Sequence, residues 1–153
     1  MASRSTIFDE QHQFWLGQRR HRQYPRSVQQ EICDATAEAP PALSPLDAIV
    51  AGLAHLDQLV APRPYLRQRQ AVISASPELT ERELIKLDGI ATAFYEGLRR
   101  RSVADSVARL AAQAGLTIFR SSFERWISPE NEEEMSLIVE DVLRQFRATV
   151  TSS

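Results

Sequence analysis

Four charged side chains fall on helix faces that are otherwise apolar, and they are the residues of this sequence best suited to chemistry. They are Asp57, Arg69, Glu83 and Arg125. A charge that becomes buried needs an opposite charge or hydrogen-bond partners. The two acids and two bases could therefore neutralise one another in a core, or they could anchor a ligand in a mostly apolar pocket, which is the usual design of a small-molecule site.

Two of these residues, Arg69 and Arg125, are predicted to be the polar anchors of such a pocket, because a guanidinium binds a carboxylate in bidentate fashion. The expected ligand is a small hydrophobic effector with an acidic or polar head. In the alternative interpretation, Arg69 pairs with Asp57 or Glu83 and the space is filled. The predicted apolar wall consists of residues near the centres of the inward-facing stripes: Leu53, Ile73, Leu87, Phe94 and Ile118.

A third interpretation is a small enzyme that uses Asp57, Glu83 and Arg69, since paired carboxylates can perform acid–base work. Nothing in their spacing selects this over core ion pairs. We therefore predict no catalytic residue and a protein that is not an enzyme.

A second cluster of charge, purely basic, lies near the N-terminus and consists of Arg19, Arg20, Arg22 and Arg26. These side chains could contact phosphates, which dominate the affinity of proteins for nucleic acids. A solvated arm is the simpler interpretation, and we find no helix-turn-helix pattern in residues 1–26.

Several other chemistries lack sequence support. The histidines, His12, His21 and His55, have no His or Cys partner at ligand spacing, so no metal site is predicted. The single Cys33 cannot form an internal disulfide. Glycine-rich phosphate-binding motifs and the nucleophile-elbow motif are absent, so no cofactor is predicted.

The elements that must position these residues are all predicted to be helices. Ser44 is a natural N-cap followed by Pro45 in the first turn, and Ser128-Pro129 is predicted to start the last helix, with four glutamates in its first turns. No segment alternates at a period of two. The sequence therefore predicts an all-α bundle of about five to six helices, at residues 27–39, 44–60, 65–75, 78–100, 103–126 and 129–149.

The helix predicted over 103–126 has an apolar arc wider than half its circumference, so it must be covered on two sides. We expect it to form a homodimer together with the helix at 129–149, with small residues permitting close approach and aromatic residues filling the far end. The predicted interface is Ala108, Ala112, Gly115, Phe119, Phe123, Trp126, Ile138, Val142 and Phe146.

Composition sets outer limits on these interpretations. With 153 residues, 43% apolar and 25% charged, the chain is expected to form one globular domain over residues 27–150, preceded by an irregular basic segment over 1–26. The net charge of −2 does not indicate a nucleic-acid binder. Without a long apolar run or a signal-peptide pattern, we expect no membrane partner and a cytoplasmic location.

Several local motifs together carry a resemblance to a known family. They are the run 66–73, Ser76-Pro77-Glu78-Leu79, the basic helix end at 98–101, the alanine-rich run 108–115, and then Phe119, Phe123 and Trp126. With these, the chain from about residue 28 to 150 resembles the C-terminal regulatory domain of TetR-family transcriptional regulators. The likeness is greatest to the branch typified by the mycofactocin regulator (MftR).

This resemblance implies an all-α domain that senses a small molecule and dimerises through its last two long helices. TetR-family repressors begin with a three-helix DNA-binding unit of roughly 45 residues, and fewer than 30 residues precede the matching region here. We therefore expect DNA binding only if a helix-turn-helix is supplied or the basic N-terminal segment suffices. The alternative is a repressor that binds DNA through that segment.

Overall fold

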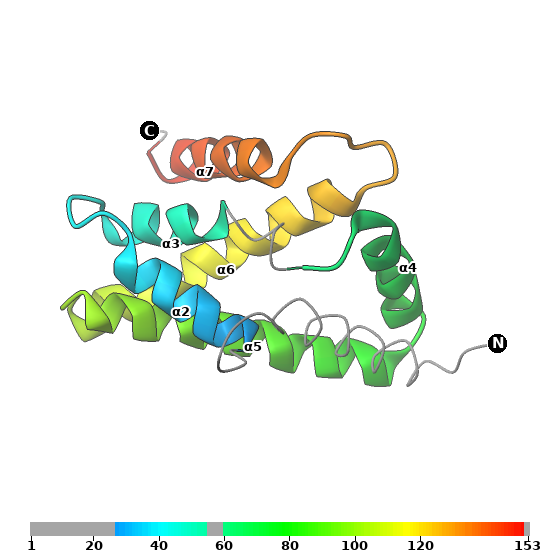
Figure 1. Ribbon diagram of the computed structural model, residues 1–153, viewed down its shortest axis with the longest axis horizontal. Coiled ribbons are helices and arrows are strands. Elements are labelled where there is room, and N and C mark those ends of the chain that lie inside the picture. The colour runs from blue at the N-terminus through cyan, green and yellow to red at the C-terminus, as the bar shows by residue number, and fades with distance from the viewer. Residues whose placement is uncertain (1–26, 55–59, 152–153) are drawn as a thin grey trace, which may run out of the picture.

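The computed structural model describes residues 27–54 and 60–151 of the chain. Residues 1–26, which hold the basic N-terminal cluster, and residues 55–59, which include His55 and Asp57, lie outside the described part. The described residues form six α-helices and no strand (Figure 1), so the predicted all-α fold is confirmed. The helices are α2 (Val28–Glu38), α3 (Pro45–Leu53), α4 (Arg63–Ser74), α5 (Pro77–Arg100), α6 (Asp105–Ile127) and α7 (Met135–Thr151).

Serine caps start three of the helices. The hydroxyl oxygens of Ser27, Ser44 and Ser76 accept hydrogen bonds from the backbone N–H groups of Gln30, Asp47 and Leu79. Each cap satisfies one of the N–H groups that a first helical turn leaves without a partner. The predicted start at Ser44 is therefore confirmed.

The long helix α5 is the base of the bundle. It runs beneath the other helices, with α2 packed along it and α6 crossing above (Figure 1). Helix α4 stands at a steep angle to α5 at one end, and α7 lies across the opposite side on top of α6. One core cluster joins the inner faces, with the side chains of Phe94, Leu98 and Ile118 completely buried in it.

The contact between α2 and α5 depends on the glycine at position 97. A Cβ atom there would lie 2.7 Å from both the carbonyl oxygen of Cys33 and the Cβ of Thr36. These distances are shorter than real contacts allow, so the two helices approach closely because residue 97 has no side chain.

The start of the last helix differs from the prediction. Residues 128–134 form turns and loop, and α7 begins only at Met135, so Ser128-Pro129 does not start a helix. Two arginines of α4 bind backbone carbonyls of this loop, including those of Ser128 and Asn131. These bonds hold the segment in its loop conformation, and four glutamates close together repel one another in a first helical turn.

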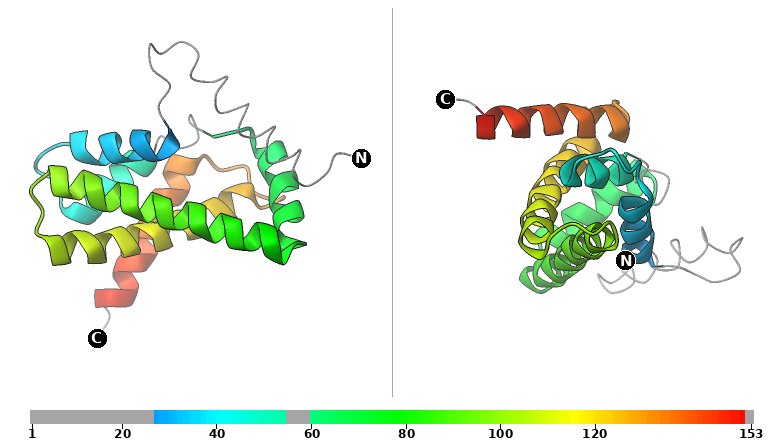
Figure 2. Two further views of the ribbon diagram at one scale, coloured as in Figure 1. Left: turned by 90° about the horizontal axis from the view of Figure 1, so that it is seen from below. Right: turned by 90° about the vertical axis from the view of Figure 1, so that its left-hand side faces the viewer.

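Helix α7 extends past the body of the bundle. Figure 2 shows its C-terminal half projecting beyond the other helices, on the side where α6 lies. The apolar stripe of α7 continues along this half, so its exposure rises along the helix: Ile138 is completely buried, Phe146 is partly buried and Val150 is 66% exposed.

Candidate functional site

The predicted anchor Arg69 lies in an ion pair within the chain. It is 4% exposed, and its two terminal nitrogens donate to the two carboxylate oxygens of Glu83, at 3.3 and 2.9 Å. Of the interpretations left open by the sequence, the structure thus brings Arg69 together with Glu83, where α4 meets the N-terminal half of α5. Asp57, the other proposed partner, lies outside the described residues.

The second predicted anchor, Arg125, lies in a different network, between α6, the following loop and α7. It donates to Asp141 at 2.5 Å and to Glu133 at 2.9 Å. These hydrogen bonds raise the pKa of Arg125, and the bond from Arg125 is the main cause that lowers the pKa of Asp141. About a third of the Arg125 side chain is exposed, so the pair fastens α7 to α6 at the surface.

The predicted pocket wall is largely packed core. Leu53, Phe94 and Ile118 are at most 1% exposed and belong to the central cluster. Ile73 is also buried, whereas Leu87 is partly buried against the cluster. Four of the five thus belong to the central cluster or pack against it, whereas Ile73 is buried outside it, and the two arginines face separate carboxylates.

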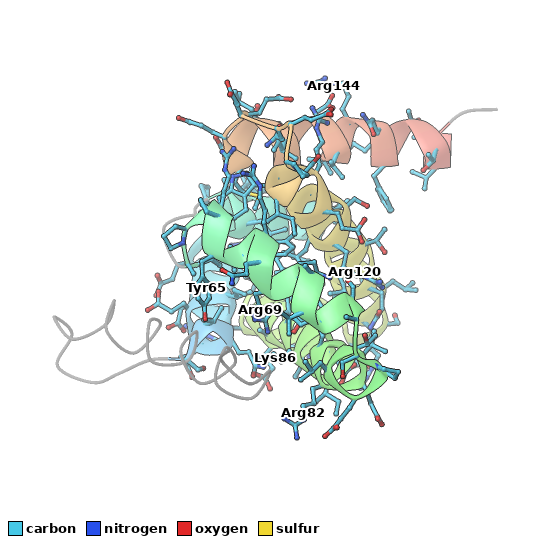
Figure 3. The ribbon with its side chains drawn as sticks, turned by 90° about the vertical axis from the view of Figure 1, so that its right-hand side faces the viewer. Tyr65, Arg69, Arg82, Lys86, Arg120 and Arg144 are labelled. Carbon is cyan, nitrogen blue, oxygen red and sulfur yellow. The ribbon has the colours of Figure 1, made fainter. Side chains whose placement is uncertain are left out.

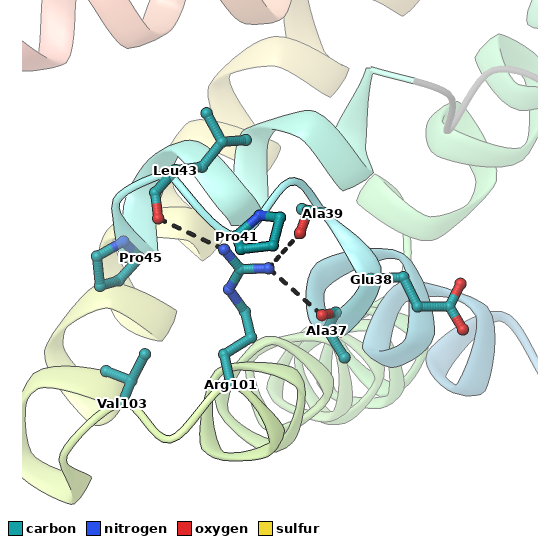
Figure 4. A pocket seen from close by; sticks show the side chains of 8 residues that line it. All are labelled: Ala37, Glu38, Ala39, Pro41, Leu43, Pro45, Arg101 and Val103. Atoms are coloured by element: carbon teal, nitrogen blue, oxygen red, sulfur yellow. Dashed lines mark hydrogen bonds between the residues drawn. The ribbon is translucent and has the colours of Figure 1, made fainter.

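A hollow of about 390 Å³ lies elsewhere, at the turn between α2 and α3 (Figure 4). Arg101 projects into it and donates to backbone carbonyls at the end of α2 and in the turn, including those of Ala37, Ala39 and Leu43. A cation at a helix C-terminus satisfies carbonyls that the helix leaves without a partner. Arg101 therefore closes the end of α2. The hollow is lined by Ala37, Glu38, Ala39, Pro41, Leu43, Pro45, Arg101 and Val103.

Two further arginines, Arg63 and Arg67 of α4, were not singled out by the sequence. Arg67 donates to the carbonyls of Ile127 and Ser128 at 2.6 and 2.9 Å, and Arg63 donates to the carbonyl of Glu133. They lie four residues apart, so they share one face of α4. Apart from this spacing, the nearby sequence gives no sign that they bind a loop, because the carbonyls that they bind lie 60 to 70 residues further along the chain.

The residues predicted for a dimer interface divide into two groups. Ala108, Ala112, Gly115, Phe119, Trp126, Ile138 and Val142 are buried by the chain's own helices, whereas Phe123 and Phe146 are partly buried. Gly115 faces α3 and α5, because a Cβ there would lie 2.8 Å from Ile49 and 3.2 Å from Phe94. The small residues of α6 thus permit close packing inside one copy, and little of the buried group is left for a partner to touch.

Large apolar side chains are nevertheless exposed on the same two helices. Val107 and Leu110 of α6 are 47% and 74% exposed, and Leu137 and Val150 of α7 are 55% and 66% exposed. Val107 and Leu110 lie one turn apart near the start of α6. Figure 2 shows that the end of α7 projects on the side of the bundle where α6 lies. We call Val107, Leu110, Phe146 and Val150 the α6–α7 apolar surface.

The inner face of α6 carries two buried polar atoms without a hydrogen-bond partner, Ser122 Oγ and Trp126 Nε1. The two residues are 1% and 4% exposed and lie one turn apart on the same face. A buried polar group without a partner costs about 1–3 kcal/mol, and a bound molecule can relieve that cost.

Two further features concern metals and membranes. In the described ranges no three His, Cys, Asp or Glu side chains are close enough to hold a metal ion. None of the six described helices is both long and apolar enough to cross a bilayer.

No protein-family model matches the chain, and no curated protein matches it.

Proposed function

We propose that this chain is a dimerising, small-molecule-sensing domain of a transcriptional regulator, of the kind found at the C-terminus of TetR-family proteins. The observation that carries the proposal is the apolar stripe of α7, which begins in the core and continues past the end of the bundle. Together with the exposed start of α6, it leaves a surface that a second copy can cover.

Geometry favours a second copy with two-fold symmetry. Each copy presents an exposed face of α6 and, on the same side of the bundle, the overhanging half of α7; a two-fold axis can place each overhang against the other copy's α6. A dimer that persists at micromolar concentration buries on the order of 1,600 Å² in total. Four apolar side chains alone would bury less area than this. The contact must therefore include the other side chains at the ends of α6 and α7 in each copy.

Small-molecule sensing is supported by the inner face of α6. Ser122 Oγ–H and Trp126 Nε1–H are buried donors, and the Arg63 guanidinium lies over the Trp126 ring, 4.9 Å from its centroid. This setting suits a hydrophobic ligand bearing a carbonyl, carboxylate or hydroxyl oxygen. This assignment moves the proposed polar contacts from Arg69 and Arg125, whose guanidinium groups face carboxylates, to Ser122 and Trp126.

The experiment is sedimentation of the full chain with two matched variants of α6. Leu110→Glu places a charge on the exposed surface and is expected to give a folded monomer, whereas wild type sediments as a dimer at micromolar concentration. Leu110→Met, which keeps an apolar side chain, is the control and should remain dimeric. A wild-type monomer, or a dimeric Leu110→Glu, would contradict the proposal.

The same samples test sensing. Octanoate and octanamide are the probes, and a rise in melting temperature that is lost in Ser122→Ala supports a ligand on the inner face of α6. Removing an unpartnered hydroxyl is expected to leave the ligand-free protein at least as stable as wild type. If Ser122→Ala destabilises the ligand-free chain by more than about 1 kcal/mol, the hydroxyl has a structural partner and the site is wrongly placed.

A further inference from the structure

The N-terminal half of α5 has an exposed face that combines apolar and acidic side chains. Glu81, Leu84, Ile85 and Asp88 follow one another at steps of three, one and three residues, which place all four on one side of the helix. Leu84 and Ile85 are 53% and 68% exposed, and Glu81 and Asp88 are exposed as well. We call these four residues the α5 acidic–apolar face.

The two carboxylates of this face keep their charge uncompensated within the described part of the chain. Among those residues no ion pair involves Glu81 or Asp88, whereas Glu78, one turn earlier, pairs with Arg82 at 3.4 Å. Figure 3, which shows the end of the bundle where α5 begins, has Arg82 pointing away from α4. This side of α5 therefore lies on the outside of the bundle, where a further segment can reach it.

Helix α2 stops just short of the α5 acidic–apolar face. The two helices run in the same direction, because a Cβ atom at Gly89 would meet the side chain of Gln29, whereas one at Gly97 would meet Thr36. Figure 1 shows the first half of α5 extending beyond the start of α2. The chain that precedes Ser27 therefore joins α2 close to Gly89, which directly follows Asp88.

The 26 residues before Ser27 lie outside the described part of the chain, and their sequence complements this face. They contain five arginines and two acidic residues, and the part that leads into α2, residues 19–26, holds four arginines and no acid. An apolar run, Phe14-Trp15-Leu16, precedes the arginines. An extended chain covers roughly 3.4 Å per residue, so residues 17–26 can span about 30 Å, whereas Leu84 lies about 8 Å along α5 from Gly89.

We propose that the α5 acidic–apolar face is the docking surface for residues 1–26 of the same chain. The apolar run 14–16 packs on Leu84 and Ile85, and the arginines of 19–26 lie beside the two carboxylates. Opposite charges attract the segment to the face, and contact between the apolar side chains removes both sets from water. The covalent link gives the segment an effective concentration on the order of millimolar, so a contact too weak to hold a separate peptide is still occupied.

This docking is independent of the proposed dimer and of the ligand on α6, because it uses neither surface. The test follows Trp15 in the full chain. Protein grown with 5-fluorotryptophan gives ¹⁹F signals from Trp15 and Trp126, and Trp15→Phe identifies the first of them. A fluorinated peptide of residues 1–26 gives the position of the signal without docking.

We expect the Trp15 signal of the full chain to lie away from the peptide position. The double variant Leu84→Ser with Ile85→Ser should return it to that position, and it should keep the packed core because both residues are exposed. Glu81→Gln with Asp88→Asn should move the signal part of the way. Raising NaCl from about 50 mM to about 500 mM should act in the same direction, because salt screens exposed charges.

The matched control lies on α7, where Leu137 and Glu140 are also exposed and three residues apart. Leu137→Ser with Glu140→Gln makes the same kinds of change and should leave the Trp15 signal of the wild-type chain in place. A wild-type Trp15 signal at the peptide position would overturn the docking, since a solvated arm gives that result. A displaced signal that the α5 variants do not move would overturn the assignment to this face.

A mixing experiment separates docking within one chain from docking onto a second copy. Unlabelled wild-type protein is added to the labelled Leu84→Ser/Ile85→Ser variant, whose own face is lost. The Trp15 signal is expected to stay at the peptide position. Recovery of the wild-type position would show that the segment binds another copy and would overturn the proposal.

Discussion

The junction of α4 with α5 and the junction of α6 with α7 each contain an arginine that the sequence marks as a possible ligand anchor. Arg69, at the first junction, is buried and faces Glu83 through both terminal nitrogens. Arg125, at the second, is about one third exposed and divides its hydrogen bonds between Asp141 and Glu133. The same residue type is therefore a core component in one place and a surface fastening in the other.

This difference shows that the burial of an ion pair, rather than the number of its partners, decides how much the pair contributes to stability. Removing one member of a buried pair leaves the other charge without compensation, whereas water replaces the lost partner at the surface. Both junctions leave large apolar side chains exposed: Leu84 and Ile85, which follow Glu83 on α5, and Val150 at the end of α7.

The largest expected effect is at the buried junction. Arg69→Met keeps most of the apolar volume and leaves the Glu83 carboxylate without its guanidinium. Because Glu83 is about one quarter exposed, we expect a loss of about 3 kcal/mol, at the low end for a buried pair. Thermal and urea unfolding of the full chain measure it.

The control is the double variant Arg69→Met with Glu83→Leu, which removes both charges and should recover much of the lost stability. A single Arg69→Met variant as stable as wild type would show that the pair is not buried in solution. In that case the distinction between the two junctions disappears.

A smaller effect is expected at the exposed junction. Arg125→Met removes two hydrogen bonds, yet water reaches the side chains of Arg125, Asp141 and Glu133. The melting temperature should therefore fall by less than about 3 °C. High salt should reduce this difference further, because solvent screens exposed pairs. A loss as large as that of Arg69→Met would mean that the α6–α7 fastening is covered in solution, as a dimer would cover it.

The smallest expected effect is in the pH dependence of the exposed pair. Arg125 lowers the folded-state pKa of Asp141 below its usual value. A group with a lowered folded-state pKa stabilises the fold above its unfolded pKa, near 3.9, and this stabilisation is lost as the pH falls through the folded value. The difference between wild type and Asp141→Asn should therefore be constant from about pH 5 to 8 and disappear in more acidic solution. A difference that persists at pH 2 would contradict it.

Helix α6 shows what a one-dimensional pattern can predict. Its wide arc of apolar residues predicts that the helix is covered on two sides; within the chain α3, α5 and α7 pack against it, and Val107 and Leu110 remain exposed. The sequence assigned Ala112 and Gly115 to a partner molecule, but α3 and α5 cover this side in the structure. Periodicity identifies apolar faces and does not say which neighbour covers each, because packing partners are distant in sequence.

The sequence by itself determined the elements of this fold. Serine caps, prolines in first turns and apolar stripes act within a few residues of one another, so they predict helices such as α2 and α5 without knowledge of the rest of the chain. The tertiary structure alone decided that Arg69 meets Glu83 and that Arg63 and Arg67 hold the loop before α7. These outcomes depend on how α4 is placed against α5 and α6, and the burial and hydrogen bonding that fix this placement come from residues far apart in the chain.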